Sequence, residues 1–432
     1  MVNILYILSF CHLILTVYGD RNSPSIEENQ IKNFTKFLEN SLNKTVLEYT
    51  LKSLTKPGDN FGAVLRSVVV KVADEENDSD ENDIYNVVMK TPVTNPILAK
   101  FFKPAVTFVN EVRFYTDIIP ALEQFEEIAN VPLEERLDAL IPCLGSRFSL
   151  NSNAEYADSD AILLLENIKF QNFTNVDKHI GFNTNETLAI LKVLAKYHAL
   201  GIAIRRLKST LYNTKIDPYT KSHSLWKEND NATYELIYGE LKRVLNLTSE
   251  MSDAVDNMYA MHEKYMKDFS IAIDTPYTTV VHGDLWFNNI MIRKDTKSIK
   301  VKIYDFQTYF YESFVFDLSY FLFTSVGNID LNANFTLFVD YYISEFQKMM
   351  NLLKCPMDDY THEKMWHEFR ERAKFSSFFI IFHTKVANAN YDLMPSLDKL
   401  DKDPLRLSTP ASKAAIDQWK FIIDVFMRNG LV

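Results

Sequence analysis

The sequence predicts an α+β fold of two lobes, in which a smaller β-rich lobe is followed by a larger, mainly helical one. The chain of 432 residues is 47% apolar and 24% charged, an ordinary globular composition, and it is too long for one simple core. Short runs rich in apolar and β-branched residues, at 63–72, 84–90 and 161–168, are typical of strands and lie early in the chain. The last third instead repeats apolar residues at helical spacing.

Residues 1–19 form an uncharged and largely apolar segment. The run is short for a membrane span, and residues 17–19 (VYG) offer small or aliphatic side chains where a signal peptidase cleaves. We therefore expect a signal peptide that directs the protein into the secretory pathway, with no stable membrane association after its removal. An uncleaved anchor, a hydrophobic N-terminal helix and a cytoplasmic location are the alternatives. No later stretch is expected to be long and apolar enough to span a bilayer.

The net charge of the chain limits its possible binding partners, whereas its cysteines do not decide its cellular compartment. The net charge of −11 and the isoelectric point near 5.4 argue against nucleic acid or an anionic membrane as a partner, because both call for a basic face. Once the leader is removed with Cys11, Cys143 and Cys355 remain, which allow one disulfide or two buried thiols. Asn-x-Ser/Thr sequons, which give weak support to secretion, occur at Asn33, Asn43, Asn77, Asn172, Asn185, Asn231, Asn246 and Asn334.

The most informative stretch is residues 282–293 (HGDLWFNNIMIR), followed by residues 301–307 (VKIYDFQ). It places Asp284 five positions before Asn289 and delivers Asp305 at the end of an apolar strand. Phosphoryl transfer needs one carboxylate to orient the acceptor hydroxyl and accept its proton, and oxygen ligands to hold Mg²⁺ against the nucleotide phosphates. We therefore predict that Asp284 is the catalytic base and that Asn289 and Asp305 are magnesium ligands. Two buried strands joined by a polar turn are the alternative.

The β-rich part of the chain adds two features that suit nucleotide binding. Gly58 and Gly62 precede the strand at 63–72 and would let backbone N–H groups approach the phosphates, although such a pair more often makes a plain hairpin. Glu111 lies on a helix after the strand that ends at Lys90, where a carboxylate can pair with a lysine and hold its ammonium at the phosphates. A surface carboxylate and a solvated strand end are the alternatives for these two residues.

Residues 282–291 (HGDLWFNNIM), 305–307 (DFQ) and 317–324 (DLSYFLFT) resemble the invertebrate ecdysteroid kinase-like family, which is related to the aminoglycoside and choline phosphotransferases. The resemblance extends over nearly the whole chain after the leader. It implies a bilobal, protein-kinase-like fold, with a nucleotide-binding lobe over residues 30–168 and a catalytic and substrate lobe over residues 169–432.

Carried over residue by residue, the resemblance assigns Lys90 to the α- and β-phosphates of ATP and Glu111 to the ion pair that holds Lys90 in place. It assigns Glu166 to the hinge between the lobes, where the backbone meets the adenine edge. Asn167 follows it at a position where relatives commonly carry Asp. Asp317 is expected to cap the helix that it heads and, by the resemblance, to brace the loop that carries the catalytic Asp.

The resemblance implies an enzyme that uses ATP and Mg²⁺ to phosphorylate a hydroxyl of a small molecule, with an ecdysteroid or a hydrophobic xenobiotic alcohol as the acceptor. Choline, ethanolamine or an aminoglycoside is the alternative acceptor. The high aromatic content, 13% of residues, suits either a packed core or a pocket for a flat substrate. A catalytically silent secreted protein that binds a hydrophobic ligand is the alternative from another class, because ATP is scarce outside cells.

Overall fold

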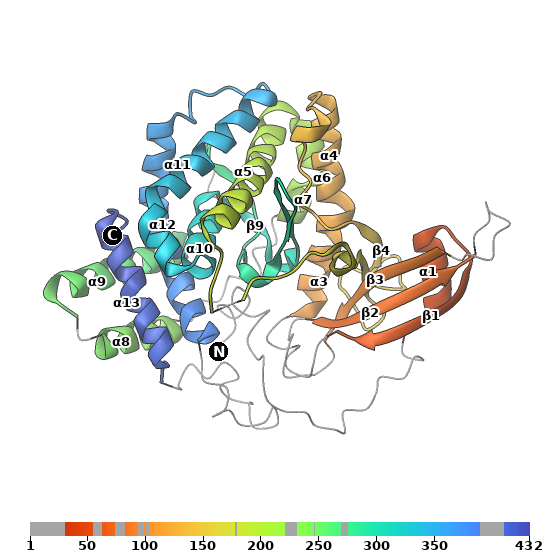
Figure 1. Ribbon diagram of the computed structural model, residues 1–432, viewed down its shortest axis with the longest axis horizontal. Helices are drawn as coiled ribbons and strands as arrows, with labels where there is room; N and C mark the ends of the chain where they lie inside the picture. Colours follow the sequence, from red (N-terminus) through yellow and green to blue (C-terminus); the bar gives the residue numbers. More distant parts are fainter. Residues whose placement is uncertain are drawn as a thin grey trace.

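The protein has an N-terminal part built on a β-sheet and a larger helical body (Figure 1). The computed structural model describes residues 31–54, 63–73, 83–93, 99, 103–177, 179–220, 231–245, 247–268, 275–388 and 410–432. Gly58, Gly62, the expected signal peptide and the sequons at Asn77 and Asn246 lie outside the described residues.

The N-terminal lobe contains a five-stranded antiparallel sheet with the strand order β1-β2-β3-β5-β4. The strands are β1 (Val46–Ser53), β2 (Ala63–Val72), β3 (Asp83–Pro92), β4 (Cys143–Arg147) and β5 (Ile162–Glu166). Successive side chains of a strand face opposite sides of a sheet. Ile162 and Leu164 of β5 accordingly pack with helix α1 (Phe34–Leu42), while Leu163 and Leu165 join the main core. The three predicted strands are confirmed.

A long helical segment runs beside this sheet (Figure 1). Helix α3 (Pro104–Arg113) continues through a π-helical turn, η2 (Phe114–Ile118), into helix α4 (Ile119–Ile128). Such turns are rare and are often found at functional sites. The segment places Glu111 of α3 in the buried space next to the sheet.

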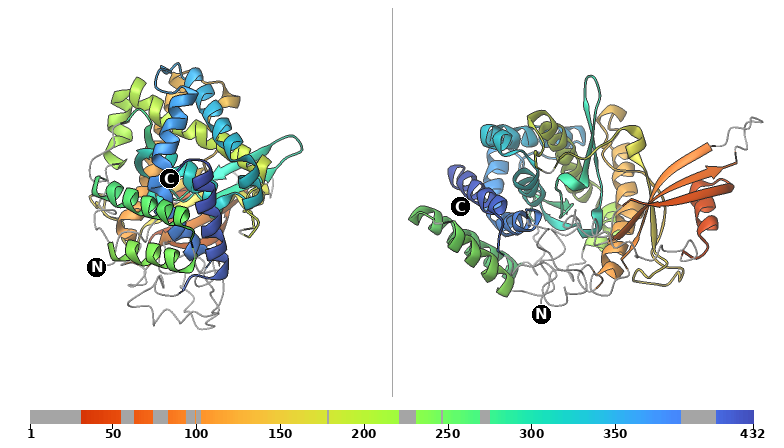
Figure 2. Two further views of the ribbon diagram at one scale, coloured as in Figure 1. Left: turned by 90° about the vertical axis from the view of Figure 1, so that its left-hand side faces the viewer. Right: turned by 60° about the horizontal axis from the view of Figure 1, so that its bottom comes forward.

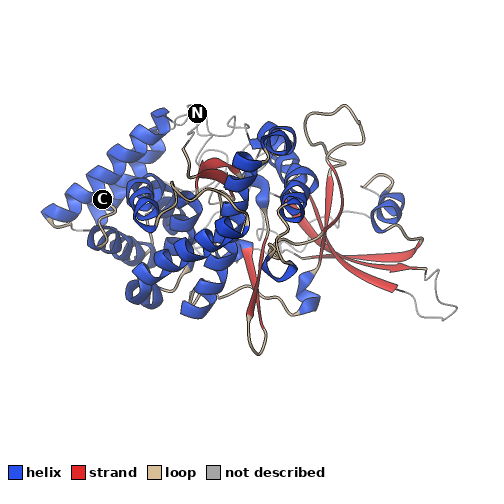
Figure 3. Ribbon diagram, turned by 90° about the horizontal axis from the view of Figure 1, so that it is seen from above, coloured by secondary structure: helices blue, strands red, loops and turns tan. Residues whose placement is uncertain are grey.

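The C-terminal lobe is mainly helical. Its helices are α5 (Thr184–Leu207), α6 (Ser209–Lys215), α7 (Asp217–Thr220), α8 (Asn231–Val244), α9 (Ser249–Asp268), α10 (Val315–Ser325), α11 (Asn328–Leu352), α12 (His362–Ala387) and α13 (Lys413–Arg428). Two ribbons complete it, β6 (Thr278–Val281) with β9 (Phe310–Ser313) and β7 (Ile290–Lys294) with β8 (Ile299–Ile303). Figure 3 shows the sheet at one side of the molecule and most helices at the other, which confirms the predicted two-lobed α+β fold.

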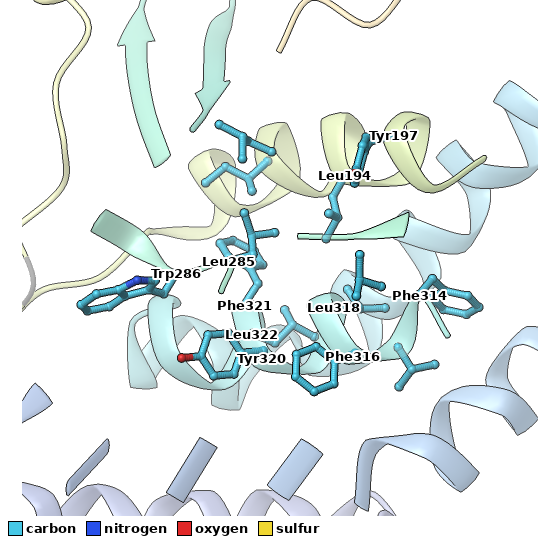
Figure 4. Packing of buried hydrophobic residues seen from close by; sticks show 14 of the residues in the cluster. Leu194, Tyr197, Leu285, Trp286, Phe314, Phe316, Leu318, Tyr320, Phe321 and Leu322 are labelled. Carbon is cyan, nitrogen blue, oxygen red and sulfur yellow. The ribbon is translucent and has the colours of Figure 1, made fainter. Parts of the chain in front are cut away.

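Helix α5 lies at the centre of the C-terminal lobe. It begins with a capping box, in which the Asn183 side chain accepts a hydrogen bond from the N–H of Glu186 and the Glu186 carboxylate accepts one from the N–H of Asn183. Leu194 and Tyr197 of α5 face residues of α10 and of the segment after β6 (Figure 4). One of the described helices, α5, is long and apolar enough to span a membrane. Of its most apolar window, 78% is buried inside the fold. The expectation that no later stretch is long and apolar enough to span a bilayer is therefore wrong. A core helix that is buried on all sides can be as apolar as a membrane-spanning helix.

The helices near the C-terminus form the end of the molecule far from the sheet. Figure 2 shows α8 and α9 in green beside α13 in dark blue. Helix α13 packs on α12, and the start of α13 lies near the end of α12 and the end of α10, where a cavity opens.

Candidate active site

The loop that carries Asp284, residues 282–289, is here called the Asp284 loop. Gly283 has a φ of +81°, and a Cβ built on it would lie 2.5 Å from the backbone oxygen of Thr308. Only glycine fits, because both the left-handed backbone and the close approach exclude a side chain. The Asp284 loop therefore packs directly against the segment that follows Asp305.

Asp317 holds the Asp284 loop through its backbone. The carboxylate is fully buried and accepts hydrogen bonds from the N–H of His282 at 2.6 Å and of Gly283 at 3.0 Å. Its Oδ2 also lies 3.1 Å from Nε2 of His198 on α5. The N-cap of α10 is Phe314, and it makes no side-chain capping bond. The predicted capping role of Asp317 is therefore wrong, whereas its contact with the loop agrees with the resemblance.

Asp284 is 1% exposed, and hydrogen bonds fix both of its carboxylate oxygens. Oδ1 accepts from the hydroxyl of Tyr320 at 3.2 Å, and Oδ2 accepts from Nδ2 of Asn289 at 3.1 Å. Burial first, and then the negative charge of Asp305, raise the pKa of Asp284 well above its ordinary value. Hydrogen bonds from Tyr320, Asn289 and Trp286 act in the opposite direction, because they stabilise the ionised form.

Asn289 uses its amide nitrogen inside the loop. Nδ2 donates to the backbone oxygen of Asp284 at 2.8 Å as well as to the carboxylate. The amide oxygen Oδ1 accepts no hydrogen bond from the part of the chain that the structure describes. The backbone oxygen of Asn289 accepts from the N–H of Tyr304 at 3.1 Å, and Nε2 of His282 lies 2.9 Å from the oxygen of Tyr304. These two contacts tie the Asp284 loop to Tyr304, the residue before Asp305.

Lys90 joins the two lobes electrostatically. Its ammonium lies 2.5 Å from Oε2 of Glu111 on α3 and 2.7 Å from Oδ1 of Asp305. All three side chains are buried, so Lys90 is no solvated strand end and Glu111 no surface carboxylate. Burial, partly opposed by Lys90 and reinforced by Asp305, raises the pKa of Glu111 to about 7. The structure thus brings together Lys90, Glu111 and Asp305, with Asp284 and Asn289 adjoining them.

The residue after Asp305 anchors this arrangement to the N-terminal lobe. Phe306 is 1% exposed and stacks on Phe114 of the π-helical turn, with ring centroids 3.7 Å apart. The ring of His282 lies on another side of Phe306, at 4.4 Å between centroids. Asp305 itself has a φ of +69°, a left-handed conformation that Asp tolerates better than most residues.

The remaining predicted residues lie apart from this cluster or outside the described residues. Glu166 ends β5, its N–H donates to the oxygen of Pro142 at 3.0 Å, and its carboxylate accepts from Gln171 at 2.6 Å. The N–H of Asn167 donates to the oxygen of Asn86 at 2.9 Å, so both amides are engaged within the protein. The structure does not bring Glu166 to Asp284, and its contact with adenine stays a prediction. The same holds for the phosphate contact predicted for Gly58 and Gly62.

Two residues near Asp284 were not predicted as site residues, namely Tyr320 and His383. The hydroxyl of Tyr320 also lies 2.8 Å from Nδ1 of His383, a buried residue of α12. Tyr320 falls one helical turn after Asp317, inside the stretch 317–324, so the sequence held a signal for it. Nothing in the sequence marked His383, which lies 63 positions from Tyr320.

A cavity of about 590 Å³ lies beside the Asp284 loop. Its wall combines apolar and uncharged polar side chains, among them Phe287, Phe323, Thr324, His383, Thr384 and Gln418. No Lys or Arg from the described ranges lines it. Among the described residues Asp330 supplies the one carboxylate of the wall, and its Oδ1 accepts from the N–H of Thr184 at 2.9 Å and from the Thr184 hydroxyl at 2.5 Å. As far as it is described, the wall is therefore apolar and uncharged polar apart from this one carboxylate.

The donor set also bears on metal binding. Within the described residues, no group of three or more His, Cys, Asp or Glu side chains could hold a metal ion. Mg²⁺ needs no such group, since it usually binds one or two carboxylates and completes its shell with phosphate and water. Asp305 and the free amide oxygen of Asn289 are oxygen ligands of this kind. Burial first, and then the negative charge of Asp305, raise the pKa of both Asp284 and Glu111, and the same negative charge favours a divalent cation nearby.

The site combines a buried carboxylate, an amide oxygen and a second carboxylate with an ion-paired lysine from the β-sheet lobe. This combination is typical of a phosphotransferase of kinase-like fold. The particular family follows from the sequence profile of the ecdysteroid kinase-like family, which matches residues 57–355. The chain belongs to this family. It is a small-molecule kinase whose acceptor is a hydroxyl group.

Solved structures that match the chain include three phosphotransferases. An ethanolamine kinase from Plasmodium vivax has 10% identity, a TM-score of 0.37, and coverage of 91% of this chain and 86% of its own. An amicoumacin kinase with AMP-PNP and Ca²⁺ has 11% identity, a TM-score of 0.37, and coverage of 90% and 97%. A GDP complex of an aminoglycoside 2′-phosphotransferase has 10% identity, a TM-score of 0.39, and coverage of 92% and 98%. At these scores the likeness carries no argument about function. No curated protein sequence matches the chain.

Proposed function

We propose that this protein uses ATP and Mg²⁺ to phosphorylate a hydroxyl of an ecdysteroid or of a hydrophobic xenobiotic alcohol. The observation that carries the proposal is the buried ionic cluster of Lys90, Glu111 and Asp305 beside the carboxylate of Asp284. Removing these charges from water costs free energy that their mutual attraction only partly offsets. Binding of nucleotide phosphates and a divalent cation gives such a cluster a function.

Each member of the cluster has a role in this proposal. Lys90 binds the α- and β-phosphates, and Glu111 keeps its ammonium in place. Asn289 and Asp305 hold Mg²⁺, which when bound neutralises charge on the phosphates and on the transferred group. Asn289 offers its amide oxygen because its nitrogen donates to Asp284.

Asp284 orients the acceptor hydroxyl and takes up its proton. Its carboxylate is held by Tyr320 and Asn289 before any substrate binds, so little rearrangement is needed at the moment of transfer. Burial raises its pKa, which makes it a better proton acceptor than an exposed Asp.

The cavity beside the Asp284 loop supports an uncharged acceptor over a cationic one. Choline and aminoglycosides carry positive charge, and among the described residues that line the cavity Asp330 alone supplies a carboxylate, whose Oδ1 accepts two hydrogen bonds from Thr184. The volume of about 590 Å³ lies within the usual range for small-molecule sites, roughly 300–1,000 Å³. Ecdysteroids and hydrophobic alcohols suit a wall that mixes aromatic and uncharged polar groups.

The main experiment incubates purified protein with ATP, Mg²⁺ and a panel of steroid and phenolic alcohols, and detects products by mass spectrometry. We expect a phosphorylated product that requires both ATP and the acceptor, and its loss in Asp284→Asn. ADP release that Asp284→Asn leaves unchanged would contradict the role of Asp284. Binding of an alcohol with no product under any condition would support the silent ligand-binding protein instead.

A second experiment tests the position of the acceptor. Ala387 ends α12 and lines the cavity, so Ala387→Trp would fill part of it. We expect a higher KM for the acceptor and an unchanged KM for ATP. The control is Asp417→Trp, because Asp417 is exposed on α13 and the same side chain is then added outside the cavity. An acceptor KM unchanged by Ala387→Trp would place the acceptor elsewhere.

We also infer that the protein enters the secretory pathway and loses residues 1–19. The apolar leader supports this location, and so does the exposure of the sequons at Asn33, Asn43, Asn172 and Asn185. Expression of the full chain in insect or mammalian cells, followed by N-terminal sequencing of the mature protein, tests it. A mature chain that still begins at Met1 in the cytoplasm would overturn it.

A further inference from the structure

Tyr320 of α10 and His383 of α12 link the carboxylate of Asp284 to the wall of the cavity. The hydroxyl of Tyr320 lies 3.2 Å from Oδ1 of Asp284 and 2.8 Å from Nδ1 of His383. All three residues are buried, at 2% exposure or less. Figure 4 shows Tyr320 and Trp286 at the same end of the central core, and the ring of His383 packs edge-on against Trp286 at 4.4 Å between centroids.

Hydrogen-bond chemistry fixes the direction of this chain. The phenol of Tyr320 has one proton, and an ionised Asp284 can only accept, so Tyr320 donates to Asp284. The oxygen of Tyr320 must then accept from His383, which requires the proton of the imidazole to sit on Nδ1. Desolvation lowers the pKa of His383 to about 3, so the ring is neutral and its second nitrogen, Nε2, carries no proton.

This arrangement leaves an uncompensated acceptor in the core. Nε2 of His383 is buried and has no hydrogen-bond partner within the described residues. A buried polar atom without a partner typically costs about 1–3 kcal/mol of stability. An apolar side chain would pack at this position without that cost, so stability does not explain the histidine.

We propose that Tyr320 and His383 are positioning residues, which hold the carboxylate of Asp284 in the orientation that phosphoryl transfer requires. His383 fixes the phenol of Tyr320 by donating from Nδ1, and Tyr320 in turn fixes Oδ1 of Asp284. Asn289 fixes the other oxygen, Oδ2, so the plane of the carboxylate is set from two sides. This proposal rests on the proposed function, because it gives Asp284 the role of the base.

The first test is kinetic and uses steady-state rates of the full-length enzyme. Tyr320→Phe keeps the ring and removes the hydroxyl, and we expect kcat to fall roughly 10- to 100-fold, since small displacements of catalytic groups have effects of this size. The KM values for ATP and for the acceptor should stay within about twofold in Tyr320→Phe, because Tyr320 is not among the residues that line the cavity. An unchanged kcat in Tyr320→Phe overturns the proposal.

The second test separates positioning from packing at His383. In His383→Asn the amide nitrogen matches the position of Nδ1 and can still donate to Tyr320, whereas in His383→Gln the amide lies near the position of Nε2 and is too far along the side chain. We expect His383→Asn to retain most of kcat and His383→Gln to lose as much as Tyr320→Phe. Equal losses in the two variants would mean that His383 only fills space, and would overturn its positioning role.

A matched control guards against a general effect of removing a buried phenol. Tyr238 is also buried, and its hydroxyl lies 3.3 Å from Ser377 of α12, on the same helix as His383. Tyr238→Phe should leave kcat unchanged while its midpoint of thermal unfolding shifts about as much as that of Tyr320→Phe. A fall in kcat equal to that of Tyr320→Phe would show that loss of any hydroxyl against α12 is enough, and would overturn the proposal.

A third test needs no turnover and therefore distinguishes failure of this proposal from failure of the proposed function. In ¹⁵N-histidine-labelled protein, the signal of His383, assigned by its absence in His383→Asn, should report a neutral ring with the proton on Nδ1. In Tyr320→Phe this single tautomer should be lost. A wild-type ring with the proton on Nε2 would overturn the proposal, even in a protein with kinase activity. The expected tautomer in a protein that phosphorylates nothing would refute only the proposed function.

Discussion

The two lobes contribute to the active site through different kinds of interaction. In the C-terminal lobe the Asp284 loop is held through its own backbone, by Asp317 on one side and by the contacts with Tyr304 on the other. In the N-terminal lobe Lys90 and Glu111 reach the site as a buried ion pair. The geometry of the loop is therefore set when the lobe folds, whereas the position of the lysine depends on the balance of nearby charges. The difference predicts which substitutions damage the loop and which damage nucleotide binding.

The largest effect is expected for Asp317→Asn, which attacks the C-terminal half of the site. The amide can accept from only one of the two N–H groups of His282 and Gly283, so the other is left buried without a partner. We expect kcat/KM to fall about 100-fold or more, because the Asp284 loop shifts, and the midpoint of thermal unfolding to fall as well. Steady-state kinetics and calorimetry measure the two effects.

The control for Asp317→Asn is Glu186→Gln. Glu186 is equally buried and also accepts from a backbone N–H, that of Asn183, but it lies at the start of α5, away from Asp284. It should lower stability with little change in kcat. Full activity in Asp317→Asn would contradict the idea that folding sets the geometry of the loop.

Lys90→Met attacks the N-terminal half. It leaves Glu111 and Asp305 buried without their cation, and breaking a buried pair in this way costs about 3–5 kcal/mol. We expect ATP affinity, measured by calorimetric titration, to be lost. The double variant Lys90→Met/Glu111→Gln should regain part of the stability, because it removes one of the unpaired charges, but none of the affinity.

A second buried lysine provides the comparison for Lys90. Lys385 of α12 pairs with Glu240 of α8 in the C-terminal lobe, and both side chains are buried. Lys385→Met should cost similar stability and leave ATP affinity unchanged. If Lys90→Met binds ATP as well as the wild type does, the lysine has no part in nucleotide binding.

Sequence reasoning found the parts of the site that are close together in the chain. Asp284, Asn289 and Asp305 fall within a strand-loop-strand unit, where spacing fixes geometry, so their convergence could be predicted. Lys90 and Glu111 were identified through the family resemblance, since a strand end and a helix carboxylate are ambiguous by themselves. Their roles in catalysis remain predictions, while their proximity is a property of the structure.

The parts that sequence reasoning missed depend on contacts between distant segments. His383 reaches Tyr320 only because α12 packs on α10, and no local pattern encodes that crossing. Asp317 had a capping signature, but the N-cap of the helix is Phe314, three residues before Asp317. Helix α8 was not predicted; it packs on α9, α12 and α13, and such tertiary packing supplies most of the stability of a short helix.

A smaller, pH-dependent effect tests whether buried charge is a general property of the N-terminal lobe. Glu126 of α4 is 2% exposed, it accepts from the N–H of Leu137 at 2.9 Å, and burial raises its pKa from 4.5 to about 7. Between these two values the unfolded chain loses the proton before the folded protein does. The free energy of unfolding therefore falls by about 1.4 kcal/mol per pH unit as the pH rises through this window.

Glu126→Gln removes this dependence. Relative to wild type the variant should gain stability between pH 4.5 and 7, and the gain should be constant above pH 7. Urea unfolding at pH 5 and pH 8 measures it. Glu127→Gln, an exposed neighbour on the same helix, should behave as the wild type does at both values. A gain that is the same at pH 5 and pH 8 would mean that Glu126 is ionised in the fold throughout.

The smallest effect concerns how each lobe presents its sequons in the secretory pathway. Asn33 and Asn43, in the N-terminal lobe, are exposed, whereas Asn334 of α11 is half-buried and its amide nitrogen donates to the hydroxyl of Thr184 at 3.1 Å and to the oxygen of Asp330 at 3.2 Å. A glycan replaces one of the two hydrogens on that nitrogen, so glycosylation at Asn334 would remove at least one of these two hydrogen bonds. Peptide mass spectrometry of the secreted protein should find glycans at Asn33 and Asn43 and none at Asn334. A glycan at Asn334 would mean that the glycosyltransferase modifies the chain before α5 and α11 pack. The set of glycosylated sequons would then report the order of folding and not the exposure of the folded protein.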